Sequence, residues 1–203
     1  PNGKDATGPI GNGKLSVFQT MVDSYEMDNG LPISDPNSGY DSTGFWDGQI
    51  WDGKAYREVK DVSNMYKNRD PRFYATIFFQ NEYWDSTNHI RKLKFAYYGG
   101  NNGASDGWPK SGTNCVTGYN WRKWSDPRVD VKHNTGNANR NYPIFRYAEI
   151  LLDYAEAMNE YLDAPSQDVY DAINKIRDRV SMPELPITSE DHTKEGMRAR
   201  IHN

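Results

Sequence analysis

The sequence predicts a mainly α-helical fold with a loop-rich region and minor β content. The helical prediction rests on residues 146–160 and 169–180, where apolar side chains recur at every third or fourth position and form one stripe along each helix. Residues 34–53 and 99–118 carry Gly, Asn, Asp and aromatic residues without such a period, which is typical of long loops. Short runs of β-branched and aromatic residues after position 72 supply the β content.

The N-terminal residues predict an extended segment followed by a short helix. Residues 1–16 are rich in Gly, Asn and Lys, which favours an extended conformation. The apolar residues of 18–25 then fall in helical register, and the Asn29-Gly30 pair supplies a stop signal. We therefore expect one helix of about two or three turns before the first loop.

The first predicted loop, residues 34–53, contains Trp46 and Trp51. Its polar residues at 35, 37 and 41 are spaced like the start of a calcium-binding loop. The Gly at the sixth position and the Glu at the twelfth position of such a loop are both absent. We therefore expect no calcium site, and the four scattered His residues offer no other metal-ligand spacing.

Two strands are predicted in the middle of the chain. Asp70-Pro71 predicts the end of a helical segment. Residues 73–79 have the length and composition of a strand, and 93–97 place large apolar side chains at alternate positions. We expect these two segments to pair as a hairpin or small sheet, joined by a loop over 80–92.

The last third of the chain predicts a pair of packed helices. The second helix begins after Ser166, which is placed to cap it, and a further helical pattern follows around Met197 and Ile201. Two amphipathic helices with a short link form an antiparallel pair, like one repeat of a tetratricopeptide-type array. One such pair cannot bury its outer faces alone, so we expect further helices to cover them. The stripe that needs cover on the first helix comprises Tyr147, Ile150, Leu151, Tyr154, Ala155 and Met158.

Composition leaves several classes of function without support. A net charge of -4 and a pI near 5.6 give no electrostatic reason to expect nucleic acid or an anionic membrane as a partner. No apolar run reaches the length of about 18 residues that a membrane-spanning helix needs. Phosphate-binding, dinucleotide-binding and hydrolase motifs are absent from the sequence, so we expect no cofactor. We expect Cys115 to be a semi-buried thiol rather than a nucleophile, because no His lies near it in sequence.

Aromatic residues in polar loops favour carbohydrate as the ligand. The chain has 6 Trp and 14 Tyr, many of them beside Asn, Asp and Gly. Sugars pack their C–H faces on aromatic rings and direct their hydroxyls to amide and carboxylate groups. A glycoside hydrolase needs only two suitably spaced carboxylates, and a helical-repeat adaptor needs only the helices, so both stay as alternatives.

Five motifs stand out along the chain. They are YEMDNGLPI at 25–33, RDPRFYATI at 69–77, TGYNWRKW at 117–124, FRYAEILLDYAEAMNE at 145–160 and AINKIRDRV at 172–180. In this order they resemble the SusD/RagB family, the surface glycan-binding lipoproteins of Bacteroidota-type bacteria. The chain departs from the family at Val180-Ser181, where relatives usually carry Ala-Gly before Met-Pro.

The resemblance implies a domain that is only partly contained in this chain. Full-length relatives carry an N-terminal lipidated Cys and several helical repeats before the matching region, and a long continuation after it. We therefore expect residues 1–203 to form one partial SusD-like domain. Its residues 20–143 would be a loop-rich region with a small β-hairpin, and 144–203 would be tetratricopeptide-like helices that continue beyond the chain.

The resemblance also implies a function. Members of the family have no catalytic activity of their own. They capture oligosaccharides at the cell surface and cover a SusC-like, TonB-dependent outer-membrane transporter. We therefore expect a glycan ligand, a SusC-like transporter partner, an outer-membrane location at the cell surface, and membrane contact only through a lipid anchor outside this chain.

Sugar contacts in the family tend to come from the loops after the Arg-Asp-Pro-Arg segment and before the Gly-Tyr motif. In this chain those loops hold the expected aromatic platforms Tyr83, Trp84 and Trp108. Nearby polar groups that suit sugar hydroxyls are Asn81, Asn101, Asn102 and Asp106. Trp46 and Trp51 are second choices for a platform.

Most other motif residues are expected to be structural. Arg69, Asp70 and Arg72 should hold the segment before the predicted strand by hydrogen bonds and ion pairs. Trp121 and Trp124 should be packing residues. The residues expected to fix the first helix against neighbouring segments are Tyr147, Glu149, Tyr154 and Glu156.

Overall fold

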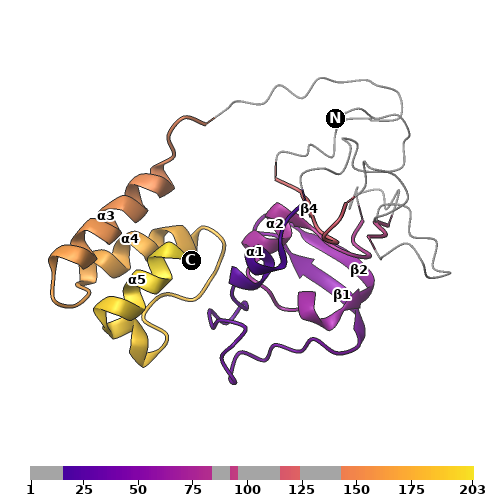
Figure 1. Ribbon diagram of the computed structural model, residues 1–203, viewed down its shortest axis with the longest axis horizontal. Coiled ribbons are helices and arrows are strands. Elements are labelled where there is room, and N and C mark those ends of the chain that lie inside the picture. Colours follow the sequence, from indigo (N-terminus) through magenta and orange to yellow (C-terminus); the bar gives the residue numbers. More distant parts are fainter. Residues whose placement is uncertain (1–15, 84–91, 96–114, 124–142) are drawn as a thin grey trace.

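The computed structural model describes residues 16–83, 92–95, 115–123 and 143–203, and these are mainly helical with few short strands (Figure 1). In Figure 1 the helices α3, α4 and α5 gather on the left, and the strands lie on the right with α1 and α2. The bounds are α1 Gln19–Ser24, β1 Phe45–Trp51, β2 Tyr56–Ser63, the 3₁₀ turn η1 Asn64–Tyr66, α2 Pro71–Thr76, β3 Ile77–Phe78, β4 Asn120–Trp121, α3 Tyr147–Tyr161, α4 Gln167–Asp178, the 3₁₀ turn η2 Ser189–His192 and α5 Lys194–His202. We call residues 16–83, with 92–95 and 115–123, the hairpin part, and residues 143–203 the helical part.

The largest β element is an antiparallel hairpin of β1 and β2. The prediction of a loop over 34–53 is therefore wrong for its second half. Ile50 of β1 and Val59 and Val62 of β2 are buried in the core, which holds the hairpin in place. Val59 and Val62 are three positions apart, so the inward-facing residues of β2 do not strictly alternate. A register shift between Trp46 and Gly48 breaks the alternation, which explains why no strand pattern stands out in the sequence.

The segment predicted as a strand over 73–79 is mostly helix. Asp70 is not the end of a helix but the N-cap of α2, because its carboxylate accepts a 2.7 Å hydrogen bond from the Arg72 backbone N–H. Pro71 at the first helical position then suits a helix start. Only Ile77–Phe78 remains extended, as β3.

The prediction that 73–79 pairs with 93–97 as two strands is also wrong. Strand β3 pairs antiparallel with β4 instead. Leu93 contacts the chain just after β3, where its N–H donates to Glu82 and its carbonyl accepts from Asn81, at 2.8 and 2.9 Å. The two segments therefore lie side by side as expected, but through residues 81–82 rather than through a strand over 73–79.

Arg69 organises the core of the hairpin part. Its guanidinium is buried and donates to the backbone carbonyls of Val22, Tyr25 and Met65, at 2.7, 2.8 and 3.0 Å. Asp70 pairs with Arg72 beside it. The structural role predicted for these motif residues is confirmed, and burial lowers the pKa of the Arg69 guanidinium because it disfavours the charged form.

In the helical part, α3 lies against α4 and α5. The predicted helix pair is confirmed, and α3 and α4 bury Ala155, Val169 and Ile173 between them. Only half of the predicted α3 stripe is covered, however, because Tyr147 and Tyr154 remain 70% and 44% exposed.

The expectation that these tyrosines fix α3 is wrong within the described part of the chain. Glu156 does reach a neighbour, with its Oε1 2.8 Å from Nε2 of His202 in α5. Ser166 occupies the N-cap position of α4, but its side chain makes no cap hydrogen bond.

Gly196 allows a close approach at the start of α5. A Cβ at this position would lie 2.1 Å from the carbonyl oxygen of Glu190. Helix propensity alone predicts that Gly196→Ala raises the free energy of unfolding by roughly 0.5 to 1 kcal/mol. We expect instead a decrease of about 1 to 3 kcal/mol, because the backbone of η2 must move to admit the methyl group. Urea unfolding measures the sign, and a stabilised variant would contradict the close approach.

Candidate functional site

Two of the seven predicted sugar-contact residues, Asn81 and Tyr83, lie in the described part of the chain. The other five lie outside the described residues: Trp84, Asn101, Asn102, Asp106 and Trp108. The structure therefore does not bring the predicted set together. Of the loop after the Arg-Asp-Pro-Arg segment, it describes the residues up to Tyr83, directly before the predicted platform Trp84.

Asn81 and Tyr83 are tied to β2 and to residue 92. The Asn81 amide donates to the backbone carbonyl of Asp61, and its side-chain oxygen accepts from Gln80 at 3.3 Å. Its backbone is left-handed, with φ +66°, a conformation that Asn adopts more readily than most residues. Tyr83 is half-buried, and its backbone forms an isolated antiparallel β-bridge with that of Lys92. Hydrogen bonds within the chain therefore engage the Asn81 side chain.

Between them, Glu82 is the centre of a buried ion network. It is only 1% exposed, and its Oε1 accepts hydrogen bonds from Arg57 and from Arg122, the latter at 2.7 Å. Arg57 also donates to the carbonyl of Tyr74 at 2.9 Å. Burial lowers the pKa of Arg122, and the nearby Glu82 carboxylate opposes that shift. The network joins β2 to the segment that follows β3 and to the residue after β4, and no local sequence motif marks it.

Arg57 extends this network to the tip of the hairpin. Its Nε lies 3.1 Å from the Asp52 carboxylate. That carboxylate also accepts from the backbone N–H groups of Lys54 and Ala55, at 3.0 Å each. Gly53 completes the turn with φ +86°, which favours glycine. The turn between β1 and β2 is therefore stabilised both by the ion pair of Asp52 with the buried Arg57 and by the hydrogen bonds of Asp52 to the backbone of the turn.

The two second-choice tryptophans have different environments. Trp46 packs against the core of the hairpin part, and Lys67 Nζ lies 5.6 Å from its ring centroid. Trp51 lies on the opposite, outer face, next to the turn, and is half-buried beside Tyr56 of β2. Trp46 therefore has a packing role, and Trp51 remains available as a platform.

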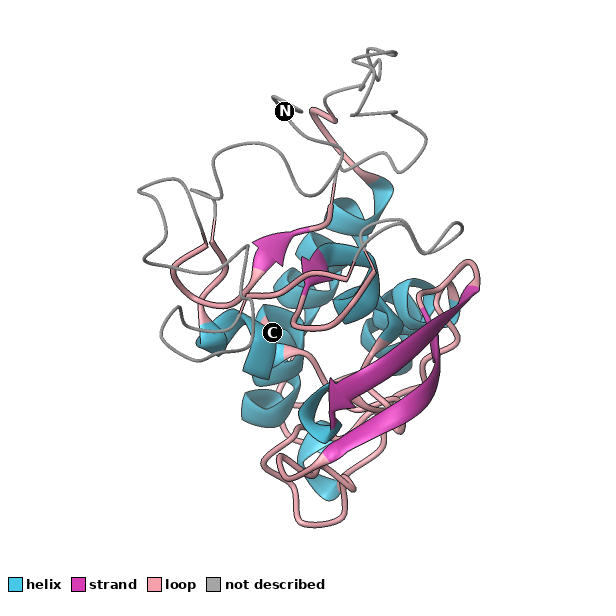
Figure 2. Cartoon of the chain, turned by 90° about the vertical axis from the view of Figure 1, so that its right-hand side faces the viewer, coloured by secondary structure: helices cyan, strands magenta, loops and turns pink. Residues whose placement is uncertain are grey.

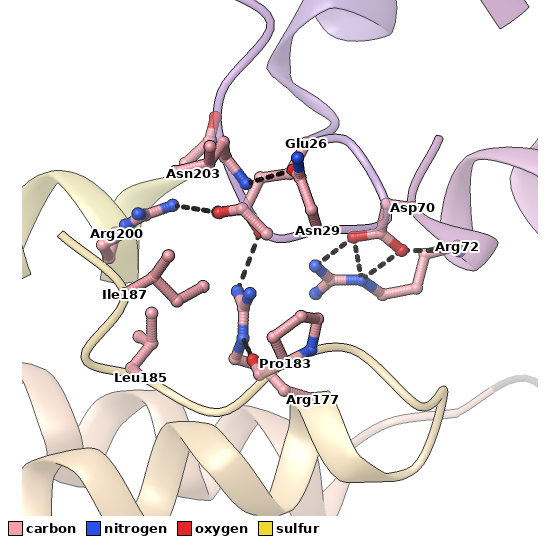
Figure 3. Close-up of polar contacts among 12 residues, drawn as sticks. Glu26, Asn29, Asp70, Arg72, Arg177, Pro183, Leu185, Ile187, Arg200 and Asn203 are labelled. Atoms are coloured by element: carbon pink, nitrogen blue, oxygen red, sulfur yellow. Dashed lines mark hydrogen bonds and ion pairs between the residues drawn. The ribbon is translucent and has the colours of Figure 1, made fainter. Parts of the chain in front are cut away.

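A second buried carboxylate, Glu26, connects the hairpin part to the helical part. It is 4% exposed, and its two oxygens accept hydrogen bonds from Arg177 of α4, at 2.9 Å, and from Arg200 of α5 (Figure 3). Arg200 also donates to Asp191 of η2 at 2.7 Å. We call Glu26, Arg177, Asp191 and Arg200 the inter-part cluster.

Asp191 should make the free energy of unfolding depend on pH in the acidic range. Burial acts to raise its pKa, but hydrogen bonds from Arg200 and from the backbone N–H groups of Thr188 and Ile187 outweigh burial and hold the pKa below the ordinary value. The carboxylate is therefore favoured in the folded state. Its contribution to stability is complete above the unfolded pKa of about 3.9 and is lost as pH falls through the lower folded pKa.

We therefore expect the free energy of unfolding to fall steeply below about pH 4 in the wild type, and less steeply in Asp191→Asn. Urea unfolding across this range measures both slopes. Asp163→Asn, at an exposed position in the link between α3 and α4, is the control. Equal slopes in the wild type and Asp191→Asn would rule out this carboxylate as a source of acid sensitivity.

Other chemistry finds no support in the described residues. They hold no group of three or more His, Cys, Asp or Glu side chains that suits a metal ion. None of their helices combines the length and apolarity needed to cross a membrane. The Cys115 thiol, expected to be semi-buried, is fully buried and donates to the Tyr119 carbonyl at 3.1 Å.

Comparisons with known proteins agree with this fold. The sequence matches the SusD family over residues 1–203. A SusD-like protein from Bacteroides fragilis NCTC 9343 has 28% sequence identity and a TM-score of 0.63, with 99% of this chain and 34% of that chain covered. A second structure, described as a SusD-like carbohydrate binding protein from the same strain, has 22% identity and a TM-score of 0.55, with 91% of this chain and 31% of that chain covered.

No curated protein matches the chain. The chain spans about a third of the length of the solved structures to which it is similar. The family match nevertheless covers every residue from 1 to 203, so the chain belongs to the SusD family.

Proposed function

We propose that this protein captures oligosaccharides or polysaccharides at the cell surface, without catalysis, and delivers them to a SusC-like, TonB-dependent transporter. The observation that carries the proposal is the match to the SusD family over residues 1–203. One similar structure is described as a carbohydrate binding protein, which supports a glycan ligand. The outer-membrane location and a lipid anchor outside this chain belong to the same proposal.

The surroundings of the buried carboxylates favour a binding protein over a glycoside hydrolase. A glycosidase needs one carboxylic acid that stays protonated near neutral pH, which requires a raised pKa. Glu26, Glu82 and Asp191 are instead each hydrogen-bonded to arginine. For Asp191, the hydrogen bonds from Arg200 and from two backbone N–H groups hold the pKa below its ordinary value, so this carboxyl group is ionised near neutral pH and cannot act as a general acid.

The fixed base before residue 84 suits a sugar-contact loop. Tyr83 leads directly from Glu82, whose carboxylate is locked by two arginines, into the predicted platform Trp84. A binding residue on a rigid base loses less conformational entropy when ligand binds. Tyr83, Trp84 and Trp108 therefore remain the proposed platforms, with Asn101, Asn102 and Asp106 as hydrogen-bonding groups.

Titration calorimetry against plant, host and microbial polysaccharides tests this function. We expect binding to at least one glycan, a loss of affinity in Trp84→Ala and Trp108→Ala, and no release of reducing sugar. Tyr161→Ala is the matched control, since this aromatic residue at the end of α3 is 84% exposed and lies in the helical part. Release of reducing sugar that ceases when one carboxylate is changed would establish an enzyme. Failure to bind any glycan would favour the protein-binding adaptor.

A further inference from the structure

We propose a second glycan-contact site on the outer face of the β1–β2 hairpin, formed by Trp51 and Tyr56. The ligand would be a neutral pyranose unit of the same glycan, so this inference rests on the proposed function. The site is separate from the predicted platforms Tyr83, Trp84 and Trp108. Figure 2 shows the two strands facing the viewer, with no described helix in front of them.

The two rings form an aromatic pair in which Tyr56 is exposed and Trp51 is half-buried. Trp51 and Tyr56 are directly opposite each other across the two strands. Their ring centroids are 5.0 Å apart and their planes are tilted by 46°. Tyr56 is 69% exposed, although a tyrosine normally gains from burying its ring. Tilted ring faces at this spacing offer a shallow surface on which the C–H face of a sugar can stack.

The pair is held rigidly before any ligand arrives. Trp51 and Tyr56 flank the turn that the Asp52 carboxylate closes with two backbone hydrogen bonds. Arg57, next to Tyr56, is buried and joins Asp52 to Glu82. An anchored turn fixes the relative position of the two rings, so binding would cost little conformational entropy.

Polar groups next to the rings complete the chemistry of a sugar site. Gln49 and Glu58 are the next cross-strand pair on the same outer face, and both are exposed. An amide and a carboxylate can bond the hydroxyls of a sugar whose ring stacks on Trp51 and Tyr56. Along β2, the negative Glu58 is followed by the positive Lys60 two positions later. This face therefore has no strong net charge that would favour an anionic or a cationic ligand over a neutral sugar.

The size of the apolar surface favours a small ligand over a protein partner. A stable protein interface buries about 800 Å² on each side around an apolar centre. Here two rings are followed directly by Gln49 and Glu58, and the next exposed aromatic residue on β1 is Phe45. Phe45 lies six residues from Trp51, which is roughly 20 Å along a strand. The patch is therefore the size of a sugar ring rather than of an interface.

The test uses Trp51→Ala and Tyr56→Ala, titrated with whichever panel polysaccharide the wild type binds. We expect each variant to lose about two- to tenfold in affinity, and Tyr56→Phe to bind like the wild type because it keeps the ring. Phe45→Ala is the matched control, because Phe45 is 68% exposed on the same strand and the same face. Thermal unfolding of each variant checks that it folds.

A second measurement is independent of truncation. The indole N–H resonance of Trp51, assigned by its loss in Trp51→Phe, should shift when the polysaccharide is added. If the wild type binds but Tyr56→Ala keeps full affinity and the Trp51 resonance does not move, the site is overturned and the proposed function stands. An equal loss in Phe45→Ala would also overturn it. If the wild type binds no glycan, the proposed function and this site fall together.

Discussion

Glu26→Gln should lower the free energy of unfolding by about 3 to 5 kcal/mol, since it leaves the buried Arg177 without a carboxylate and Arg200 with only Asp191. Glu26 is 4% exposed and bonds both Arg177 and Arg200. A neutral amide cannot compensate two guanidinium charges, and one of its two polar groups is a donor that faces other donors. Urea unfolding of the variant and the wild type gives the difference directly.

The same variant should also uncouple the two parts of the molecule. Trp46, Trp51 and Trp121 belong to the hairpin part and no Trp belongs to the helical part, so Trp fluorescence does not report on the helical part. Far-UV circular dichroism reports mainly the long helices α3 and α4. We expect the two signals to change at the same urea concentration in the wild type and at different concentrations in Glu26→Gln.

The control for Glu26 is an exposed ion pair. Glu160 of α3 bonds Arg198 of α5 at 2.6 Å, and both side chains are exposed. Exposed pairs contribute little to stability, so Glu160→Gln should unfold like the wild type with coincident signals. Coincident signals and an unchanged midpoint in Glu26→Gln would show that the inter-part cluster does not join the two parts.

The long helices α3 and α4 were predictable from the sequence because their signal is local, whereas the short helix α2 was not. The apolar period of 146–160 placed α3 within one residue of its observed bounds. The same period could not tell which half of the stripe is covered, because Ala155 is buried and Tyr147 is exposed on one helix. Which apolar residues of α3 are buried depends on the elements that pack against this helix, and a single helix pair leaves one face of each helix exposed.

The hairpin and its site were harder to predict. Trp51 stood out only as one aromatic residue in a polar segment, and Tyr56 did not stand out at all. Their pairing follows from the register of β1 and β2, which the shift at Trp46 conceals. The sequence indicated the kind of residue that contacts sugar, but not which of these residues meet.

The buried charges had no sequence signal. Glu26 meets Arg177 and Arg200 across 151 and 174 residues of chain. Pattern analysis reads an isolated Glu as a solvated residue, because most carboxylates are exposed. Only the fold brings the arginines to it, as Figure 3 shows for the contacts from α4 and α5.

Glu82→Gln should be comparably damaging, with a loss of about 3 to 5 kcal/mol, because it removes the carboxylate shared by Arg57 and Arg122. Its second effect is local: Arg57 would keep only Asp52 as an acidic partner. The hairpin tip would then loosen, so the Trp51 indole resonance should broaden in the variant even without ligand, and glycan affinity should fall with it.

Glu184→Gln separates these effects from the loss of any negative charge, since Glu184 is exposed in the segment between α4 and η2. That variant should keep both the wild-type midpoint in urea and a sharp Trp51 resonance. A Glu82→Gln protein that is destabilised but keeps a sharp Trp51 resonance would mean that the Asp52 turn holds the aromatic pair by itself. The buried network would then stabilise the fold without positioning the proposed sugar site.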